Sequence, residues 1–162
     1  IAPYPVEIVV NVQGDEPFIT KKPLKALLSE FTDPQVEVAT LAYRVELLEV
    51  ANNPNIVKLV FDKNRNALYF SRSQIPFDRD GKVLKHLFCH VGVYAFRPQA
   101  LENFVGIEPS ELEQVEKLEQ LRLLENGVDI RVVVSDYKGF GIDSPEDLEL
   151  AEKIWEDSTV VE

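Results

Sequence analysis

Cysteine is nearly absent from this sequence: Cys89 is the only one among 162 residues. A single cysteine excludes an intramolecular disulfide and a thiolate metal cluster. A chain without disulfides is compatible with a reducing compartment, so we expect a cytoplasmic protein. Apolar runs long enough to span a bilayer are also missing, and no signal-peptide pattern opens the chain, so we expect no membrane partner.

Positive charge is scarce as well. The chain has 17 Lys and Arg residues against 28 Asp and Glu, which gives a formal net charge of −11. Nucleic acids are bound through Lys- and Arg-rich surfaces, so this balance argues against a nucleic-acid partner. An anionic small molecule remains a reasonable ligand, because a metal ion and a few well-placed arginines can neutralise it locally.

The chain does have a large apolar fraction, 45% of its residues, and a regular alternation of strand and helix patterns. This fraction suffices for one compact core, so residues 1–162 are predicted to form a single α/β domain. We expect strands at 6–12, 36–44, 56–61, 67–70, 90–96 and 130–134. We expect helices at 23–31, 112–124 and 145–155, with Gly127 as C-cap of the second and Ser144 as N-cap of the third. The pair 56–61 and 67–70 is typical of a hairpin, which adds antiparallel character.

Two turns each carry an aspartate in a position that suits a metal ion. Asp15 lies in the run NVQGDEP, directly after the first expected strand. Ligands of open α/β sheets bind at the carboxyl ends of strands, and a carboxylate there suits Mg²⁺. Asp143 lies in GFGIDSPEDL, at the entrance of the last helix. Taken alone, each is more often structural, Asp15 in an acidic β-turn and Asp143 as a charge that favours the helix dipole.

Two other segments carry groups that suit an acidic, hydroxyl-rich ligand. Arg72 and Arg79 flank an apolar loop, and a guanidinium binds a carboxylate or phosphate through two parallel hydrogen bonds. The alternative for this pair is surface salt bridges in an acidic protein. Glu116 and Gln120 stand at i and i+4 of the helix expected at 112–124, so they can hydrogen-bond sugar hydroxyls together. A solvated, charged helix face is the commoner meaning of that spacing.

Six motifs, in this order, resemble those of the CMP-Kdo synthetases, the 3-deoxy-manno-octulosonate (Kdo) cytidylyltransferases. They are NVQGDEP, NPNIVKLV, ALYFSR-x-x-IPFDRD, H-x-G-x-YAFR, PS-x-LE-x-x-E-x-LEQLR and G-x-GIDSPEDLE. Together they run from near the start of the chain to near its end. The first and last are shared with other sugar-acid nucleotidyltransferases, whereas the IPFDRD and LEQLR blocks indicate the Kdo branch.

The resemblance implies a Rossmann-like nucleotide-diphospho-sugar transferase fold, with a mixed, mostly parallel sheet flanked by helices. It also implies a reaction: transfer of the cytidylyl group from CTP to Kdo, which gives CMP-Kdo and pyrophosphate for lipopolysaccharide synthesis. By the same resemblance, Asp15 and Asp143 act in catalysis as the ligands of Mg²⁺. Family members are homodimers, and we expect the interface around residues 56–70.

The resemblance also implies a set of substrate contacts. The residues expected to hold Kdo are Gln13, Arg72, Arg79, His90 and Tyr94, with the arginines on its carboxylate. Glu116 and Gln120 are expected at its hydroxyls. For His90 an equally good interpretation is an imidazole at the edge of the core, satisfied by hydrogen bonds.

Two departures from the family pattern limit these expectations. The family begins with a basic, glycine-containing loop of the type A-R-x-x-S-x-R-L-P-x-K, which cradles the triphosphate of CTP, and nothing like it occurs here. We therefore expect that the N-terminal strands are missing and that this chain has little activity alone. The second departure is the connection from Arg79 to His90, which is shorter than in many members of the family. The alternatives are a cytidylyltransferase for another acidic sugar, such as a sialic acid, and an inactive dimerisation or sugar-binding module.

Overall fold

The computed structural model describes residues 5–14, 16–46, 50, 52–142 and 145–159. Its strands form one sheet of six, in the order β4-β3-β5-β2-β6, with β1 also paired to β5. The strands are β1 (Val9–Val12), β2 (Val38–Glu46), β3 (Lys58–Phe61), β4 (Ala67–Ser71), β5 (His86–Phe96) and β6 (Ile130–Val134). The helices are α1 (Lys21–Ser29), η1 (Glu30–Thr32), α3 (Pro98–Val105), α4 (Glu111–Glu116), α5 (Gln120–Glu125) and α6 (Pro145–Thr159).

The long strand β5 holds the sheet together. It pairs with β2 along its whole length, and on its other side it pairs first with β3 and then with β1. The sheet is mixed, as predicted, but the expectation that it is mostly parallel is wrong for the described strands. Here β2 and β6 run parallel, whereas the other four described pairings are antiparallel. Periodicity along a strand indicates which faces are buried but not the direction of its partner.

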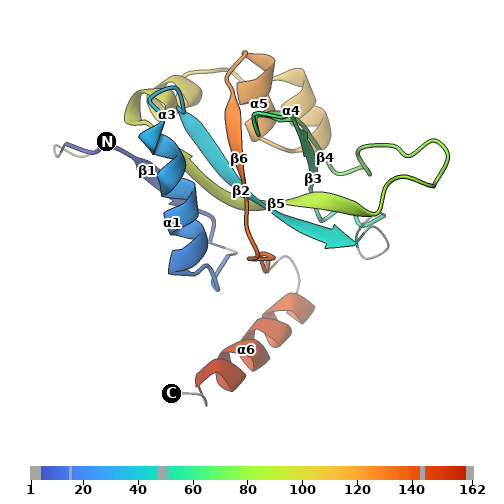
Figure 1. Cartoon of the computed structure of the whole chain (residues 1–162). Coiled ribbons are helices and arrows are strands. Elements are labelled where there is room, and N and C mark those ends of the chain that lie inside the picture. Colours follow the sequence, from blue (N-terminus) through green and yellow to red (C-terminus); the bar gives the residue numbers. More distant parts are fainter. Residues whose placement is uncertain (1–4, 15, 47–49, 51, 143–144, 160–162) are drawn as a thin grey trace.

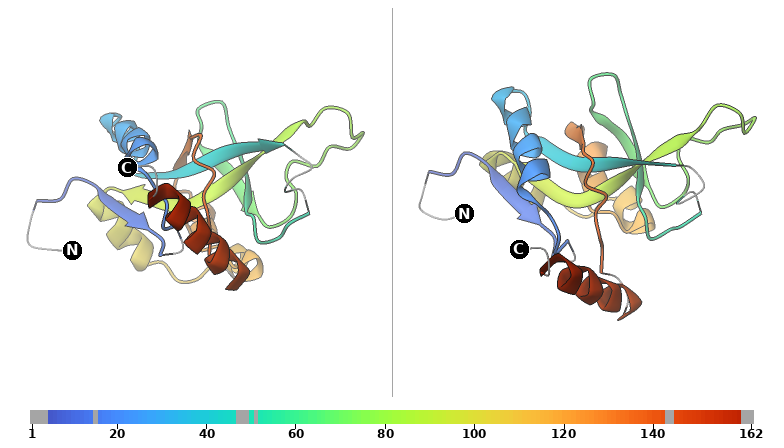
Figure 2. Two further views of the ribbon diagram at one scale, coloured as in Figure 1. Left: turned by 90° about the horizontal axis from the view of Figure 1, so that it is seen from below. Right: turned by 60° about the horizontal axis from the view of Figure 1, so that its bottom comes forward.

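Helices cover both faces of the sheet (Figure 1). Side chains alternate between the faces along each strand, so Ala39 and Leu41 of β2 pack under α1, around its fully buried Leu27. Val38 and Ala42 point to the opposite face, where they pack with α3 and α5 around Leu121. Burying a leucine side chain contributes about 1.5–3 kcal/mol. The last helix, α6, lies apart from both layers (Figures 1 and 2).

The structure corrects one expected helix and adds another. The helix expected at 112–124 is two helices, because Lys117 adopts a left-handed conformation (φ 55°) that ends α4. Glu116 and Gln120 therefore do not share one helix face. Helix α3 was not predicted, although Pro98 is a common first residue of a helix. Gly127 closes α5 as predicted, one position after the C-cap residue Asn126: its φ is 73°, and the amide of Val128 donates to the Leu123 carbonyl. Ser144, the expected N-cap of the last helix, lies outside the described residues.

Within the described ranges, no helix is both long enough and apolar enough to cross a bilayer.

Candidate functional site

A cleft of about 1250 Å³ opens where the chain leaves β1 and β6. These strands run in the same direction, since β5 is antiparallel to β1 and β2 while β6 is parallel to β2. The cleft therefore lies at a carboxyl edge of the sheet, as the sequence predicts. The side chains that line it include Gln13, Glu16, Tyr43, Asn53, Arg72, His90, Lys117, Glu119, Gln120, Lys138, Phe140 and Asp147.

The turn after β1 and the loop after β6 meet at this edge. The Glu16 carboxylate accepts hydrogen bonds from the Tyr137 hydroxyl at 2.8 Å and from the backbone N–H of Phe140 at 3.2 Å. Asp15 and Asp143, the two expected metal ligands, belong to these segments in sequence but lie outside the described residues. Among the residues that are described, no group of three or more His, Cys, Asp or Glu side chains gathers to hold a metal.

Gln13, one of the substrate contacts that the resemblance implies, lines the cleft. Its side chain lies directly over the backbone of Gly92 in β5. A Cβ atom at position 92 would stand 2.2 Å from Gln13 Oε1, closer than any real contact. The glycine therefore gives the amide of Gln13 room to lie in the cleft.

His90 lines the cleft, and its imidazole is also hydrogen-bonded to the buried side chain of Thr40. The residue therefore has features of both interpretations, a ligand contact and an imidazole at the edge of the core. The Thr40 hydroxyl, which has one proton, donates to the Val93 carbonyl at 2.9 Å. It must therefore accept from His90 Nε2, which is 3.0 Å away, and this leaves Nδ1 as an acceptor. Burial lowers the pKa of His90 to about 3, so the imidazole is neutral at pH 7.

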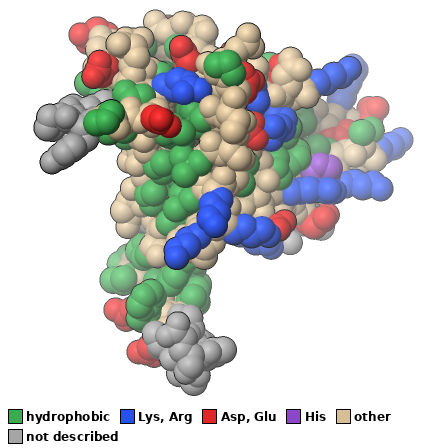
Figure 3. All heavy atoms as spheres, turned by 60° about the vertical axis from the view of Figure 1, so that its left-hand side comes forward, with side chains coloured by type: hydrophobic (Ala, Val, Ile, Leu, Met, Phe, Trp, Pro, Cys, Tyr) green, Lys and Arg blue, Asp and Glu red, His purple; other side chains and the backbone are tan. Residues whose placement is uncertain are grey.

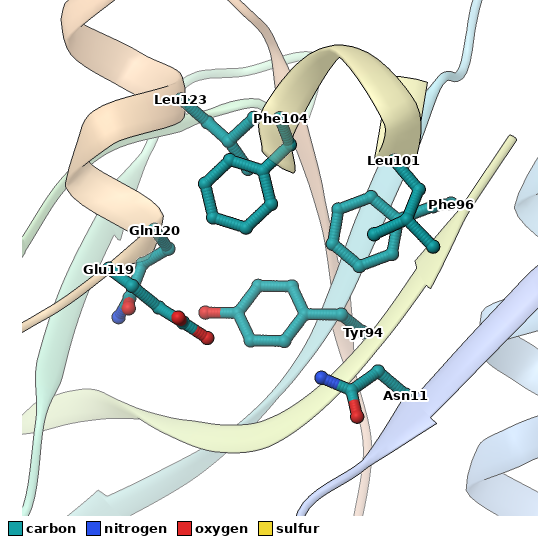
Figure 4. A pocket seen from close by; sticks show the side chains of 8 residues that line it. All are labelled: Asn11, Tyr94, Phe96, Leu101, Phe104, Glu119, Gln120 and Leu123. Atoms are coloured by element: carbon teal, nitrogen blue, oxygen red, sulfur yellow. The ribbon is translucent and has the colours of Figure 1, made fainter. Parts of the chain in front are cut away.

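Tyr94 and Gln120 meet at a small hollow of about 40 Å³ beside the cleft (Figure 4). Both side chains are buried, and within the described part of the chain neither Tyr94 Oη nor Gln120 Nε2 has a hydrogen-bond partner. Burial, and then the charge of Glu119, raises the pKa of the Tyr94 phenol, which therefore keeps its proton. Figure 4 shows that hydroxyl pointing toward Glu119 and Gln120. Unsatisfied buried polar atoms are costly, so a water or a ligand group is expected here.

Arg72 lines the cleft with its guanidinium already fixed by backbone carbonyls. Nε donates to Glu116 at 2.8 Å, Nη1 to Pro54 at 3.0 Å and Nη2 to Lys117 at 3.4 Å. These bonds use three of its five N–H groups, so two remain for an anion. Arg72 is thus held rigidly where it borders the cleft.

The structure gives two expected substrate residues other surroundings. The Glu116 carboxylate accepts from the Ser71 hydroxyl at 2.7 Å and from the Arg72 backbone N–H at 3.0 Å, and Glu116 is not among the cleft-lining residues. Arg79 is exposed on the loop between β4 and β5, also outside the lining. Its neighbour Asp78 fixes that loop through the backbone N–H groups of Val83 and Leu84, bonds that lower the pKa of Asp78.

The sequence interpretation missed several lining residues. Lys117 and Lys138 bring positive charge to the cleft of an acidic protein, and Glu119 borders both hollows. An isolated lysine carries no local sequence signal, so the position of these two in the cleft follows only from the fold. The break at Lys117 indicates why Glu119, rather than Glu116, borders the cleft.

Comparisons with known proteins indicate the family to which the chain belongs. A family model described as cytidylyltransferase matches residues 1–130. A 3-deoxy-manno-octulosonate cytidylyltransferase from Thermodesulfovibrio yellowstonii is 51% identical over 152 residues, which are 90% of this chain and 59% of that protein. One from Flavobacterium johnsoniae is 46% identical over 160 residues, which are 97% of this chain and 66% of that protein.

A solved structure is also similar. It is a CMP:2-keto-3-deoxy-manno-octonic acid synthetase complexed with CTP, and it superposes with a TM-score of 0.88 at 38% identity. The match covers 96% of this chain and 64% of that one. The chain thus spans about three fifths of the length of the relatives it matches.

Proposed function

The chain belongs to the cytidylyltransferase family, and we propose that it acts in the transfer of the cytidylyl group from CTP to Kdo. The products are CMP-Kdo and pyrophosphate, and CMP-Kdo is the activated sugar of lipopolysaccharide assembly. Relatives named for this activity are similar along most of the chain. CTP is the nucleotide in the similar solved structure.

The observation that carries the proposal is the pair of unsatisfied polar atoms beside the cleft. Tyr94 Oη and Gln120 Nε2 are buried and without a partner among the described side chains. A sugar hydroxyl can donate to one group and accept from another, so it suits a phenol and an amide at one hollow. The rigid guanidinium of Arg72 at the same cleft suits the sugar carboxylate.

In this mechanism, the oxygen of the anomeric hydroxyl of Kdo attacks the α-phosphorus of CTP, its proton is lost to solvent, and the bond from the α-phosphorus to the departing pyrophosphate breaks. The residues of this chain bind and orient the acidic sugar: Arg72 at its carboxylate, with Gln13 and the neutral His90 at polar groups nearby. Lys138, on the loop after β6, adds positive charge where two anions must meet. Holding two anions in line lowers the barrier mainly by positioning.

We also propose Mg²⁺ as the cofactor, held by Asp15 and Asp143. Carboxylate oxygens are the ligands that Mg²⁺ prefers, and the bonds of Glu16 join the two segments that carry these aspartates, so the donor set fits. When bound, the ion neutralises phosphate charge and favours in-line displacement. A homodimer with an interface around residues 56–70 and a cytoplasmic location remain predictions.

The function is tested by pyrophosphate release from CTP with Kdo and with a sialic acid, for this chain and for a longer protein of its relatives' length. We expect at least a roughly tenfold preference for Kdo, a difference of about 1.4 kcal/mol. Equal rates with both sugars would favour the acidic-sugar alternative. If neither protein releases pyrophosphate or binds CTP, the chain is a binding module and the proposal is wrong.

The metal proposal has its own test in the active protein. Replacing a metal ligand that neutralises charge on the reacting phosphates removes several kcal/mol, so Asp15→Asn is expected to lower the rate by about 100-fold or more. Asp129→Asn, at an exposed site, is the matched control and should leave the rate unchanged. Near-normal activity of Asp15→Asn would show that Asp15 is not a ligand.

A further inference from the structure

Glu16 is a buried carboxylate at the border of the cleft, with 8% of its surface exposed. Its backbone N–H donates to the Gln13 carbonyl at 3.1 Å and closes the turn after β1. Its Oε2 atom accepts from the Tyr137 hydroxyl and from the Phe140 backbone N–H, 121 and 124 residues along the chain. One side chain thus joins the turn after β1 to the loop after β6.

Two other features hold the same junction. Gly139 has a φ of +68°, and a Cβ atom there would stand 3.2 Å from Glu16 Oε1 and 3.4 Å from Val91 Cγ2. A side chain at position 139 would therefore be strained and would press on the carboxylate. The rings of Phe18 and Phe140 pack edge to face, with centroids 5.5 Å apart.

The hydroxyl of Tyr137 is a dependable donor to this carboxylate. Burial first, and then Glu16, raises the pKa of Tyr137 well above the usual phenol value, so the group stays protonated at neutral and mildly alkaline pH. A buried carboxylate needs such donors, because leaving it without them costs several kcal/mol. The hydrogen bond from Tyr137 to Glu16 is therefore expected to persist at neutral and mildly alkaline pH.

The place of these contacts in the sequence suggests what they are for. Asp15 immediately precedes Glu16, and Asp143 follows three residues after Phe140. We infer that Glu16 is a positioning residue that sets the separation of the two segments carrying Asp15 and Asp143, an inference that rests on the proposed function. Mg²⁺ demands near-ideal octahedral geometry at about 2.0–2.1 Å, so ligands on two distant segments need a third group to fix their spacing.

The experiment compares Glu16→Ala, Glu16→Gln and Tyr137→Phe with wild type in the protein active with CTP and Kdo. Glu102→Gln, an exposed carboxylate on α3, is the matched control. Mn²⁺ alone, followed by electron paramagnetic resonance, reports the metal site without turnover. Hydrogen exchange at the Phe140 amide reports the bond to Glu16 and so the junction. Exchange at the Val132 amide, which donates to the Arg65 carbonyl at 2.7 Å, reports the stability of the fold.

Loss of a group that orients metal ligands lowers metal affinity about 10- to 100-fold, so Glu16→Ala should weaken Mn²⁺ binding by at least roughly tenfold. It should also speed exchange at Phe140 while Val132 keeps its protection. Glu16→Gln keeps an acceptor oxygen, and Tyr137→Phe keeps the hydrogen bond from the Phe140 amide to Glu16. Both variants should therefore lose less Mn²⁺ affinity than Glu16→Ala. High Mg²⁺ should restore the turnover of Glu16→Ala, whereas a general loss of structure would lower turnover at every Mg²⁺ concentration.

Two results would overturn the inference. If Glu16→Ala binds Mn²⁺ as tightly as Glu102→Gln while exchange at Phe140 rises, the junction exists but does not position the metal ligands. If every variant loses turnover without a change in its Mg²⁺ dependence, Glu16 is only structural. Should wild type itself neither bind Mn²⁺ nor consume CTP, the proposed function fails together with the inference, and this outcome differs from the other two.

Discussion

At the scale of single residues, polar side chains of the cleft are already held in one conformation by hydrogen bonds within the protein. His90 donates to Thr40, and Arg72 donates to three backbone carbonyls. Such side chains need little ordering when a ligand binds, because their entropy was lost on folding. Tyr94 and Gln120 differ from them, because each has a buried polar atom that is not hydrogen-bonded within the described part of the chain and can bond a ligand.

The neutral imidazole of His90 makes stability depend on pH. Its pKa falls from 6.5 to about 3 in the folded protein because of burial. Between these values the unfolded chain binds the proton and the folded chain does not, so stability decreases as pH falls through this window, by up to about 1.4 kcal/mol per unit from this group. We expect urea unfolding at pH 7 and pH 4.5 to show a larger loss for wild type than for His90→Gln. Equal losses would mean that His90 titrates normally.

Gly92 is expected to control the position of Gln13. The methyl group of Gly92→Ala would overlap Gln13 Oε1 at 2.2 Å and force that flexible side chain away. If Gln13 contacts Kdo as proposed, the loss of this one hydrogen bond is expected to raise the KM for Kdo roughly tenfold, in Gly92→Ala as in Gln13→Ala. The double variant should show no further increase, which a double-mutant cycle measures. Additive effects would show that Gly92 acts by another route.

At the scale of elements, a joint between β3, β4 and the α4–α5 segment places Arg72. Lys58 of β3 is fully buried, and its ammonium donates to the carbonyls of Asn53 at 2.8 Å, Ile56 at 2.6 Å and Arg72. Burial lowers the pKa of Lys58. The Arg72 side chain in turn reaches Glu116 and Lys117, so one side of the cleft depends on this joint.

Removing the ammonium group should weaken the joint. Lys58→Met has a similar volume but leaves three carbonyls without their donor, so we expect a loss of about 2–4 kcal/mol in the free energy of unfolding. Lys63→Met, exposed in the same hairpin, should change it little. Urea denaturation followed by circular dichroism compares the two. A similar small change in both would mean that water replaces the ammonium group without cost.

At the scale of the whole molecule, the sheet with its two helical layers forms the main body, and α6 lies apart from it (Figure 2). Several apolar side chains of α6 are exposed, and hydrophobic atoms are visible on this lower part of the molecule in Figure 3. They include Leu148, Leu150, Ile154 and Trp155. A helix with this many exposed apolar side chains gains less from burial than the helices of the main body, so α6 is expected to unfold locally before them.

Trp155 allows this separation to be measured, because it is the only tryptophan and is 60% exposed. We expect its emission to be that of a solvated indole and to shift little in urea. Far-UV circular dichroism, to which the sheet and the other helices contribute together with α6, should show a cooperative transition of the main body that the emission does not share. A buried-type emission that shifts together with the dichroism would show α6 packed on the body.

The sequence by itself determined the features that depend on near neighbours. Periodicity and caps give most strands, helix α1 and the end of α5 at Gly127, because these depend on residues a few positions apart. The ordered motifs indicate the family. Of the sugar contacts that this resemblance implies, Gln13, Arg72 and His90 line one cleft, whereas Arg79 and Glu116 do not. Only the tertiary structure decided strand direction and the bond of Glu16 to a loop 124 residues away. Such contacts depend on packing between distant segments, which no local pattern of residues encodes.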